Sequence, residues 1–229
     1  MSDNATGFID FHAHVLPGAD HGSSNIRTSL CQLASALDAG ITTIVATPHF
    51  YPERHDIEKF LVKREKCYSD LLNDYSGIIK IIPAAEVLLC EGLNNLPCIN
   101  QLCIRGTKAM LVEMPSYKWT DRMIDTLFAI REESNLDVIL VHVDRYPYED
   151  VSELLSMDFV GQLNVESLIS PFGRKKYIRW IENGNIVALG SDIHGNGSQY
   201  NSYKKAMNIL KNNGIVLQMR MQEILQTNN

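Results

Sequence analysis

Seven short apolar runs rich in β-forming residues recur along this 229-residue chain, with helical patterns between most of them. The runs cover residues 8–11, 42–46, 78–82, 109–113, 138–143, 159–163 and 186–189. Apolar residues at helical spacing predict helices over 29–39, 56–75 and 121–133. This alternation is typical of a parallel sheet covered by helices, because each crossover between parallel strands needs a helix-length connection.

The number of units favours a barrel over an open sheet. Seven or so strand-helix units predict a single-domain α/β barrel with an irregular closure more than a doubly wound sheet. The length fits one domain, and no linker rich in proline, glycine or serine divides the chain. We therefore expect one domain over residues 1–229, with Gly40, Gly184 and Gly214 ending helices.

Nearly every apolar run is followed by a residue that can bind a metal ion. These residues are His12 and His14, His49, Glu86, Glu113, His142, and finally Asp192 and His194. The side chains that follow the strands of a barrel gather at one end of it. One histidine at a strand end is more often structural, but the regular recurrence favours a metal site of imidazoles and carboxylates. His55 lies outside this pattern and is predicted to be a surface residue without a catalytic part.

Composition excludes several classes of protein. The formal net charge is −6 and the sequence has no basic stripe, which argues against a nucleic-acid partner. The five cysteines are odd in number and lack C-x-x-C spacing, as expected for reduced thiols in a cytosol. No segment has the roughly 18 apolar residues of a membrane helix or the pattern of a signal peptide. We expect a cytoplasmic protein without direct membrane insertion.

The ligand-bearing segments resemble the PHP (polymerase and histidinol phosphatase) superfamily. The matching segments are IDFHAH at 9–14, TPH at 47–49, AE at 85–86, LVEM at 111–114, VHVDRY at 141–146 and SDIH at 191–194. The H-x-H pattern of the first segment occurs in many metallohydrolases. The last two together are similar to the branch of bacterial protein-tyrosine phosphatases from capsule and exopolysaccharide operons.

The resemblance implies a distorted (β/α)7 barrel of the PHP type, with residues 1–229 as one metallophosphatase domain. It also implies three divalent ions, with manganese expected first and iron, cobalt or zinc as alternatives. The implied ligands are His12, His14, Glu86 and Asp192 for one ion, Glu86, Glu113 and His142 for a second, and His21, His49 and His194 for the third. Three carboxylates only partly neutralise three divalent ions, so this acidic chain is expected to hold a local site for a phosphate dianion.

The activity that the resemblance implies is metal-dependent hydrolysis of phosphotyrosine on a protein. The implied substrate is the tyrosine-rich tail of a membrane-associated kinase that regulates capsule or exopolysaccharide synthesis. Catalytic roles are expected for Glu86, His142 and Arg145, with Arg145 neutralising the phosphate oxygens. The competing interpretation of Arg145 is a structural ion pair with Asp144 or Glu149.

Two positions of the expected metal and phosphate sites depart from the family pattern. The segment Asp20-His21-Gly22 has a histidine where these phosphatases usually have a second aspartate, so the third ion would gain an imidazole ligand. No arginine follows the motif that ends at His194. Lys204 is the candidate to replace that arginine in binding phosphate.

Other functions stay open from the sequence. A small-molecule phosphatase, for example one acting on histidinol phosphate, would use the same ligands, and a degenerate member would bind phosphotyrosine without hydrolysing it. A cysteine-dependent tyrosine phosphatase is excluded, because no cysteine has an arginine six positions later. Tyr51, Tyr146 and Tyr148 either line a pocket for an aromatic phosphoester or pack at the barrel rim.

Overall fold

The structure is a computed structural model that describes residues 7–195 and 200–226. Its strands are β1 (Phe8–His14), β2 (Ile41–Ala46), β3 (His49–Phe50), β4 (Lys80–Pro83), β5 (Glu86–Leu88), β6 (Ala109–Glu113), β7 (Asp137–Leu140), β8 (Val160–Asn164), β9 (Ile186–Gly190) and β10 (Ile193–His194). Its α-helices are α1 (Ile26–Asp38), α2 (Ile57–Asp74), α3 (Asp121–Glu132), α4 (Tyr148–Ser156), α5 (Val165–Ile169), α6 (Arg174–Glu182), α7 (Tyr200–Leu210) and α8 (Asn212–Gln226). Two short 3-10 helices, η1 (Leu93–Asn95) and η2 (Ile99–Leu102), lie between β5 and β6.

The strands form two parallel sheets that continue into one another. One sheet has the order β10-β1-β2-β4 and the other has the order β3-β5-β6-β7-β8-β9. Only two residues separate β2 from β3, β4 from β5 and β9 from β10. Each of these three segments therefore runs from one sheet into the other.

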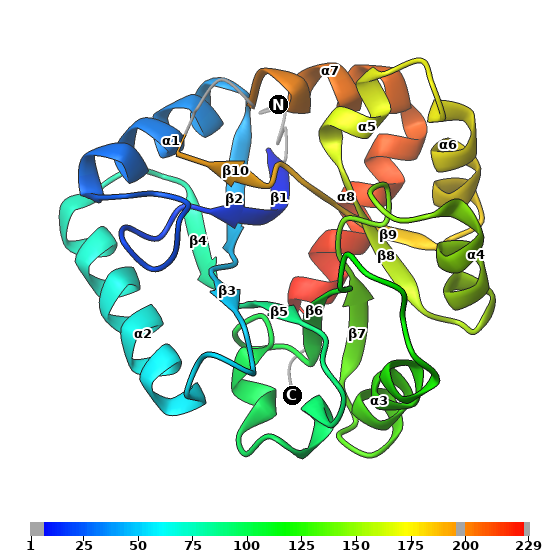
Figure 1. Cartoon of the computed structure of the whole chain (residues 1–229). Coiled ribbons are helices and arrows are strands. Elements are labelled where there is room, and N and C mark those ends of the chain that lie inside the picture. The colour runs from blue at the N-terminus through cyan, green and yellow to red at the C-terminus, as the bar shows by residue number, and fades with distance from the viewer. Residues whose placement is uncertain (1–6, 196–199, 227–229) are drawn as a thin grey trace.

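These crossings close the two sheets into a ring. β9 pairs with β8, and its continuation β10 pairs with β1 through Ala13 opposite Ile193 and His14 opposite His194. With each interrupted pair taken as one strand, seven strands follow one another around the ring. Helices α1, α2, α3, α4 and α6 lie around the outside of the strands (Figure 1). The prediction of a distorted α/β barrel is confirmed, and the distortion consists of the interrupted ladders.

The strands are buried on both faces, which explains why they read as nearly continuous apolar runs. Polar side chains set the starts of the helices. Asn25 caps α1 by accepting a hydrogen bond from the Thr28 backbone NH at 3.0 Å, and Asp56 caps α2 by accepting from the Lys59 NH at 2.9 Å. In the part of the chain that the structure describes, no helix combines the length and apolar character that crossing a bilayer requires.

The predicted elements agree with the structure apart from their ends and one glycine. Predicted strand 138–143 ends at Leu140, because the chain turns at His142 with a φ of 54°. Gly40 and Gly184 follow α1 and α6 with φ values of 86° and 85°, as expected for helix ends. The prediction for Gly214 is wrong. Gly214 lies inside α8, where an added Cβ would stand 2.9 Å from the Met207 side chain, so glycine there permits close packing on α7.

Candidate metal centre

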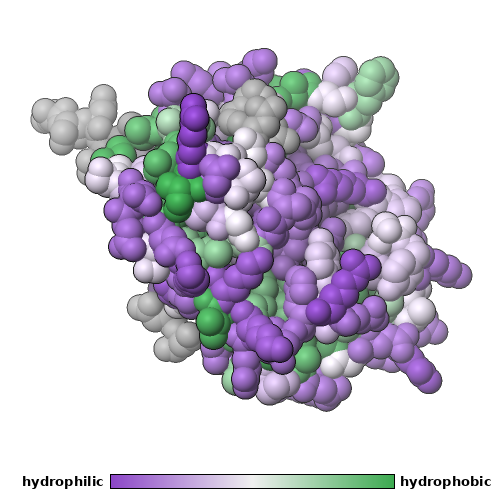
Figure 2. Space-filling view, turned by 60° about the vertical axis from the view of Figure 1, so that its left-hand side comes forward, coloured by the Kyte–Doolittle hydropathy of each residue, from purple (hydrophilic) through white to green (hydrophobic). Residues whose placement is uncertain are grey.

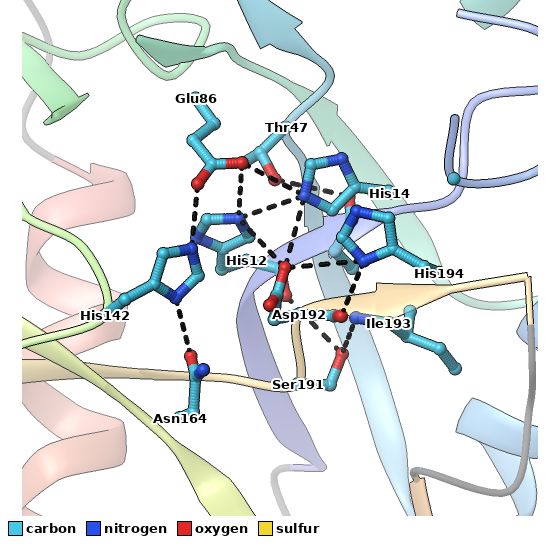
Figure 3. A network of polar contacts seen from close by, with 12 residues as sticks. His12, His14, Thr47, Glu86, His142, Asn164, Ser191, Asp192, Ile193 and His194 are labelled. Atoms are coloured by element: carbon cyan, nitrogen blue, oxygen red, sulfur yellow. Dashed lines mark hydrogen bonds and ion pairs between the residues drawn. The ribbon is translucent and has the colours of Figure 1, made fainter. Parts of the chain in front are cut away.

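Eight of the nine predicted ligands lie at the carboxyl ends of the barrel strands. Figure 3 shows how His12, His14, Glu86, His142, Asp192 and His194 come together there. The eight ligands come from β1 (His12, His14), β3 (His49), β5 (Glu86), β6 (Glu113), the turn after β7 (His142) and the β9–β10 segment (Asp192, His194). Eight of the nine predicted residues belong to groups whose possible ligand atoms lie within 4.8 Å of one another.

These eight residues form three overlapping groups. The first contains His12, Glu86, His142 and Asp192, which are all buried. The second contains His14, His49 and His194, and the third contains His49, Glu86 and Glu113. Glu86 and His49 each belong to two groups. A carboxylate can be shared between two ions through its two oxygens, whereas a neutral imidazole has a single lone pair, so Glu86 is the candidate for a shared ligand.

This grouping differs from the sets that the resemblance implies in the places of His14, His49 and His142, and at His21. The sequence suggested that His21 joins His49 and His194, whereas the structure brings His14 to them. His21 lies in the exposed loop after β1, and its ring stacks on His49 with a centroid distance of 4.7 Å and an interplanar angle of 7°. Its ring centroid is 4.8 Å from that of His194. His21 thus borders the centre through ring stacking.

Glu86 is the residue on which the imidazoles converge. Its Oε2 lies 3.2 Å from Nε2 of both His12 and His14 and 2.8 Å from Nδ1 of His49. The oxygen is buried but accepts no hydrogen bond of regular geometry. A buried carboxylate oxygen is expected to have such a partner. Three imidazole nitrogens around one carboxylate oxygen that accepts no hydrogen bond are the arrangement expected of side chains that bind metal cations.

The neighbours of His14 and His142 fix which ring nitrogen of each faces the centre. Asp20 Oδ2 lies 2.6 Å from His14 Nδ1, and Asn164 Oδ1 lies 2.9 Å from His142 Nδ1. A carboxylate and an amide oxygen accept, so both Nδ1 atoms donate. When both rings are neutral, their Nε2 atoms carry the lone pairs that a metal ion would need, and this second layer is the usual support of histidine ligands.

A buried network also connects β1 to the segment that bears Asp192. Asp10 accepts hydrogen bonds from the backbone NH of Ser191 at 2.8 Å and from its hydroxyl at 2.6 Å. The Asp192 NH donates to the His12 carbonyl at 2.8 Å. Burial raises the pKa of Asp10 to about 6, although the bonds from Ser191 and His12 oppose that shift.

The carboxylates of the centre differ in the direction of their pKa shifts. Burial disfavours the charged form of Glu86, but the nearby imidazoles of His12, His14 and His142 outweigh it and hold the Glu86 pKa well below its usual range. Burial raises the pKa of Asp192 too, but the hydrogen bond of His14 and the charges of His12, His142 and Arg145 outweigh it and lower this pKa. Burial and then the charge of Glu86 raise the pKa of Glu113.

Arg145 lies at the mouth of the centre. Its guanidinium Nη2 pairs with Asp192 Oδ2, and half of the side chain is exposed. The alternative ion pairs with Asp144 or Glu149 are absent from the described part of the chain. Arg145 therefore adjoins a candidate ligand and keeps surface for a further anion. Lys204 is an exposed residue of α7.

An aromatic cavity of about 620 Å³ opens beside the centre. Its lining includes Tyr51, Glu113, Trp119, Arg145 and Tyr146. Tyr51 stacks on His49 with ring centroids 5.3 Å apart, and burial raises its pKa to about 12. Tyr51 and Tyr146 therefore line a pocket, the first of the two roles that the sequence left open for the tyrosines.

Tyr148 and His55 lie outside this cavity. The Tyr148 ring stacks on Trp180 with centroids 5.2 Å apart, so Tyr148 packs at the rim. His55 is exposed, as predicted for a surface residue.

Sequence reasoning missed the residues that orient the ligands. Asn164 ends β8, so the search for polar residues at the ends of apolar runs would have found it after the run 159–163. Asp20 was visible only as a neighbour of His21. Asp10 and Gln162 lie inside apolar runs, and the Gln162 Oε1 that accepts from the His142 NH at 3.1 Å carries no sequence signal.

Residues 8–229 match a family model described as capsular polysaccharide synthesis, CpsB/CapC. The chain is similar to the putative tyrosine-protein phosphatase CapC of Staphylococcus aureus, with 26% identity over 202 residues that cover 81% of this chain and 76% of the relative. It is also similar to the tyrosine-protein phosphatase YwqE of Bacillus subtilis strain 168, with 26% identity over 203 residues that cover 81% and 77%.

Solved structures agree with the fold. One, from work on YwqE of Bacillus subtilis and CpsB of Streptococcus pneumoniae as metal-dependent tyrosine phosphatases, superposes with a TM-score of 0.75 at 21% identity and covers 96% of this chain and 95% of that chain. The histidinol phosphate phosphatase of Lactococcus lactis, solved with zinc, histidinol and phosphate, gives a TM-score of 0.58 at 15% identity, covering 91% and 94%.

Proposed function

Because the chain belongs to the capsular polysaccharide synthesis CpsB/CapC family, we propose that it is a metal-dependent phosphatase that hydrolyses phosphotyrosine on a protein. Its curated relatives are named tyrosine-protein phosphatases. The observation that carries the proposal is the convergence of eight imidazoles and carboxylates at one end of the barrel, within 4.8 Å in each group.

We propose that the residues of the three groups hold three divalent ions, with manganese as the first candidate. Imidazoles mixed with carboxylates suit manganese, iron, cobalt or zinc, and availability often selects among these metals. When bound, such ions lower the pKa of water toward about 7 and stabilise charge on a phosphoryl group. His21 stands beside the second group as a candidate for the ninth ligand, by rotation of its ring away from His49.

The protein side chains have separate tasks in this proposal. Glu86 would be shared between two ions, because its two oxygens face different imidazoles: Oε1 faces His142 at 2.8 Å, and Oε2 faces His12, His14 and His49. Arg145 binds an equatorial oxygen of the phosphate and neutralises charge that spreads in the transition state. Tyr51 and Tyr146 flank the aromatic ring of the substrate in the cavity that Arg145 also lines.

We further propose that the substrate is the tail of a membrane-associated bacterial tyrosine kinase and that the protein acts in the cytoplasm. The family model concerns capsule synthesis. The five cysteines are free, which suits a reducing compartment.

The test compares a phosphotyrosyl peptide with histidinol phosphate as substrates of the manganese-loaded protein. We expect a higher kcat/KM for the peptide, and a preference for histidinol phosphate would contradict the proposal. Glu86→Gln is the matched control: it keeps the shape of the side chain but removes the charge, so activity should fall to background while the circular dichroism spectrum stays unchanged. Elemental analysis of both proteins reports the metal content.

A further inference from the structure

A second cavity, of about 420 Å³, adjoins the metal centre on the side of α2. His21 and His49 form its wall toward the centre, and Tyr51 lines both this cavity and the aromatic one. The remaining wall carries three cations: Arg54, Lys59 and Lys63. We call these three residues, with the space that they line, the basic cavity. The molecular face on the side of α1 and α2 is largely hydrophilic (Figure 2).

The basic cavity has more cations than carboxylates in its lining. Among the described residues, none of its three cations takes part in an ion pair, whereas Lys66, on the same helix, pairs with Asp70 at 2.5 Å. Lys63 donates to the Ala19 carbonyl at 2.8 Å, and the Arg54 guanidinium lies 5.8 Å from the Tyr51 ring centre. Both contacts hold the cations in place without removing their charge.

The acidic groups in the lining are already engaged. Asp20 is paired with His14, and the Asp56 carboxylate caps α2. Burial and then the charges of Lys63 and Arg54 lower the pKa of His55, so His55 is neutral at pH 7. The lining therefore sets three cations against the two carboxylates of Asp20 and Asp56, so its net charge stays positive on a chain whose overall charge is −6.

We propose that the basic cavity binds an anionic side chain next to the phosphotyrosine in the same substrate peptide. The inference rests on the proposed function, since it assigns the segment that flanks the scissile residue. Tyr51 separates the two cavities, so a peptide whose phosphotyrosine enters through the aromatic cavity passes over Tyr51 and reaches the three cations with a neighbouring residue. A carboxylate and a second phosphotyrosine share the chemistry required, and phosphate carries about −1.5 to −2 charges at pH 7.

The experiment uses one phosphotyrosyl peptide sequence in three forms, with glutamine, glutamate or phosphotyrosine at the flanking positions. For the manganese-loaded wild type we expect kcat/KM to be roughly two- to fivefold higher with glutamate than with glutamine, the range of one exposed charge pair. The difference should lie in KM and decrease with added salt. A larger gain with phosphotyrosine would identify phosphate as the preferred ligand.

Lys59→Ala and Arg54→Ala test the assignment, with Lys66→Ala as the matched control on α2. The two cavity variants should bring the glutamate-to-glutamine ratio toward one, and the control should keep it. A ratio of one in the wild type, or an unchanged ratio in both cavity variants, would overturn the inference while leaving the phosphatase proposal intact. Absence of hydrolysis of all three peptides would overturn both proposals.

Discussion

At the scale of the residue, two candidate ligands adopt backbone conformations that are unfavourable for their type. His142 and Asp192 have φ values of 54° and 52°. Each such residue costs about 1–3 kcal/mol and persists only where its surroundings fix it. Gln162 fixes His142, and the His12 carbonyl fixes Asp192. The left-handed backbone at these two residues turns their side chains toward the centre. In a regular extended strand the two side chains would point in other directions.

The residue that orients His142 gives a first prediction. Asn164→Ala removes the acceptor of the His142 Nδ1–H bond, so the ring loses its fixed tautomer and orientation. We expect about a 10- to 100-fold loss of metal affinity or activity, the usual effect of such a change. Asn164→Asp keeps an acceptor for this hydrogen bond and should retain most of the wild-type metal affinity and activity. Metal competition with a chromophoric chelator measures the loss; equal affinities for all three proteins would refute the role.

Arg145 gives a second prediction. Arg145→Ala should lower kcat/KM for a phosphotyrosyl peptide by about 10- to 100-fold, since it removes a charged donor for the phosphate oxygens. Arg145→Lys keeps the charge without the planar fork and should give an intermediate value. The metal content of both variants should match the wild type by elemental analysis. Normal kinetics of Arg145→Ala would return this residue to a structural pairing with Asp192.

At the scale of the element, six of the seven barrel strands position a candidate ligand through their carboxyl ends, and β8 positions Asn164, which orients His142. The ladder between β1 and β2 shifts register between Asp10 and Ala13, where His12 lies. Such irregularities re-aim side chains next to active sites. The close approach of β9 to β1 depends on Gly190, where an added Cβ would stand 2.5 Å from His12 Cβ and 2.7 Å from Gln162 Nε2.

Gly190→Ala should therefore damage both the barrel and the site. We expect a destabilisation of about 1–3 kcal/mol from overpacking, because the nearest atoms belong to the backbone-proximal part of His12 and to a bonded amide. Urea unfolding of the protein gives the free energy. Metal affinity should fall as well, since His12 is displaced. An alanine variant with wild-type stability and affinity would show that β9 can move away from β1 at no cost.

At the scale of the whole molecule, the centre concentrates charge inside a ring of strands. Three carboxylates and five histidines from six strand segments meet there, and most of them are buried. Bound cations would therefore tie together strands that are far apart in sequence. Any ligand that binds only the folded state stabilises it, by about 2.7 kcal/mol at 100 times its Kd.

Removing the metal should consequently lower the melting temperature. We expect a drop of about 5–10 °C on chelation, from that free energy and the shift of about 2–4 °C per kcal/mol for a domain of this size. Calorimetry with and without chelator measures it, and added manganese should restore the original value. A melting temperature unchanged after verified metal loss would mean that the ring of strands does not depend on the ions.

The sequence by itself determined the strand runs, the first three helices and the chemistry at the strand ends. Burial on both faces makes the core strands continuous apolar runs, which stand out from the amphipathic helices around them. The ligands were visible because a parallel barrel collects the residues that follow its strands, so local position along the chain decides which side chains face the site.

Only the tertiary structure decided how these side chains are shared. Possible ligand atoms of His14 lie within 4.8 Å of those of His49 and His194, whereas His21 is exposed and stacks on His49. The two-residue strands β3 and β10 exist through pairing with distant segments, and their own sequences are too short to specify them. Asp20, Asn164 and Gln162 orient ligands from 6 to 22 positions away in sequence. Such contacts depend on three-dimensional distance, which periodicity along the chain does not encode.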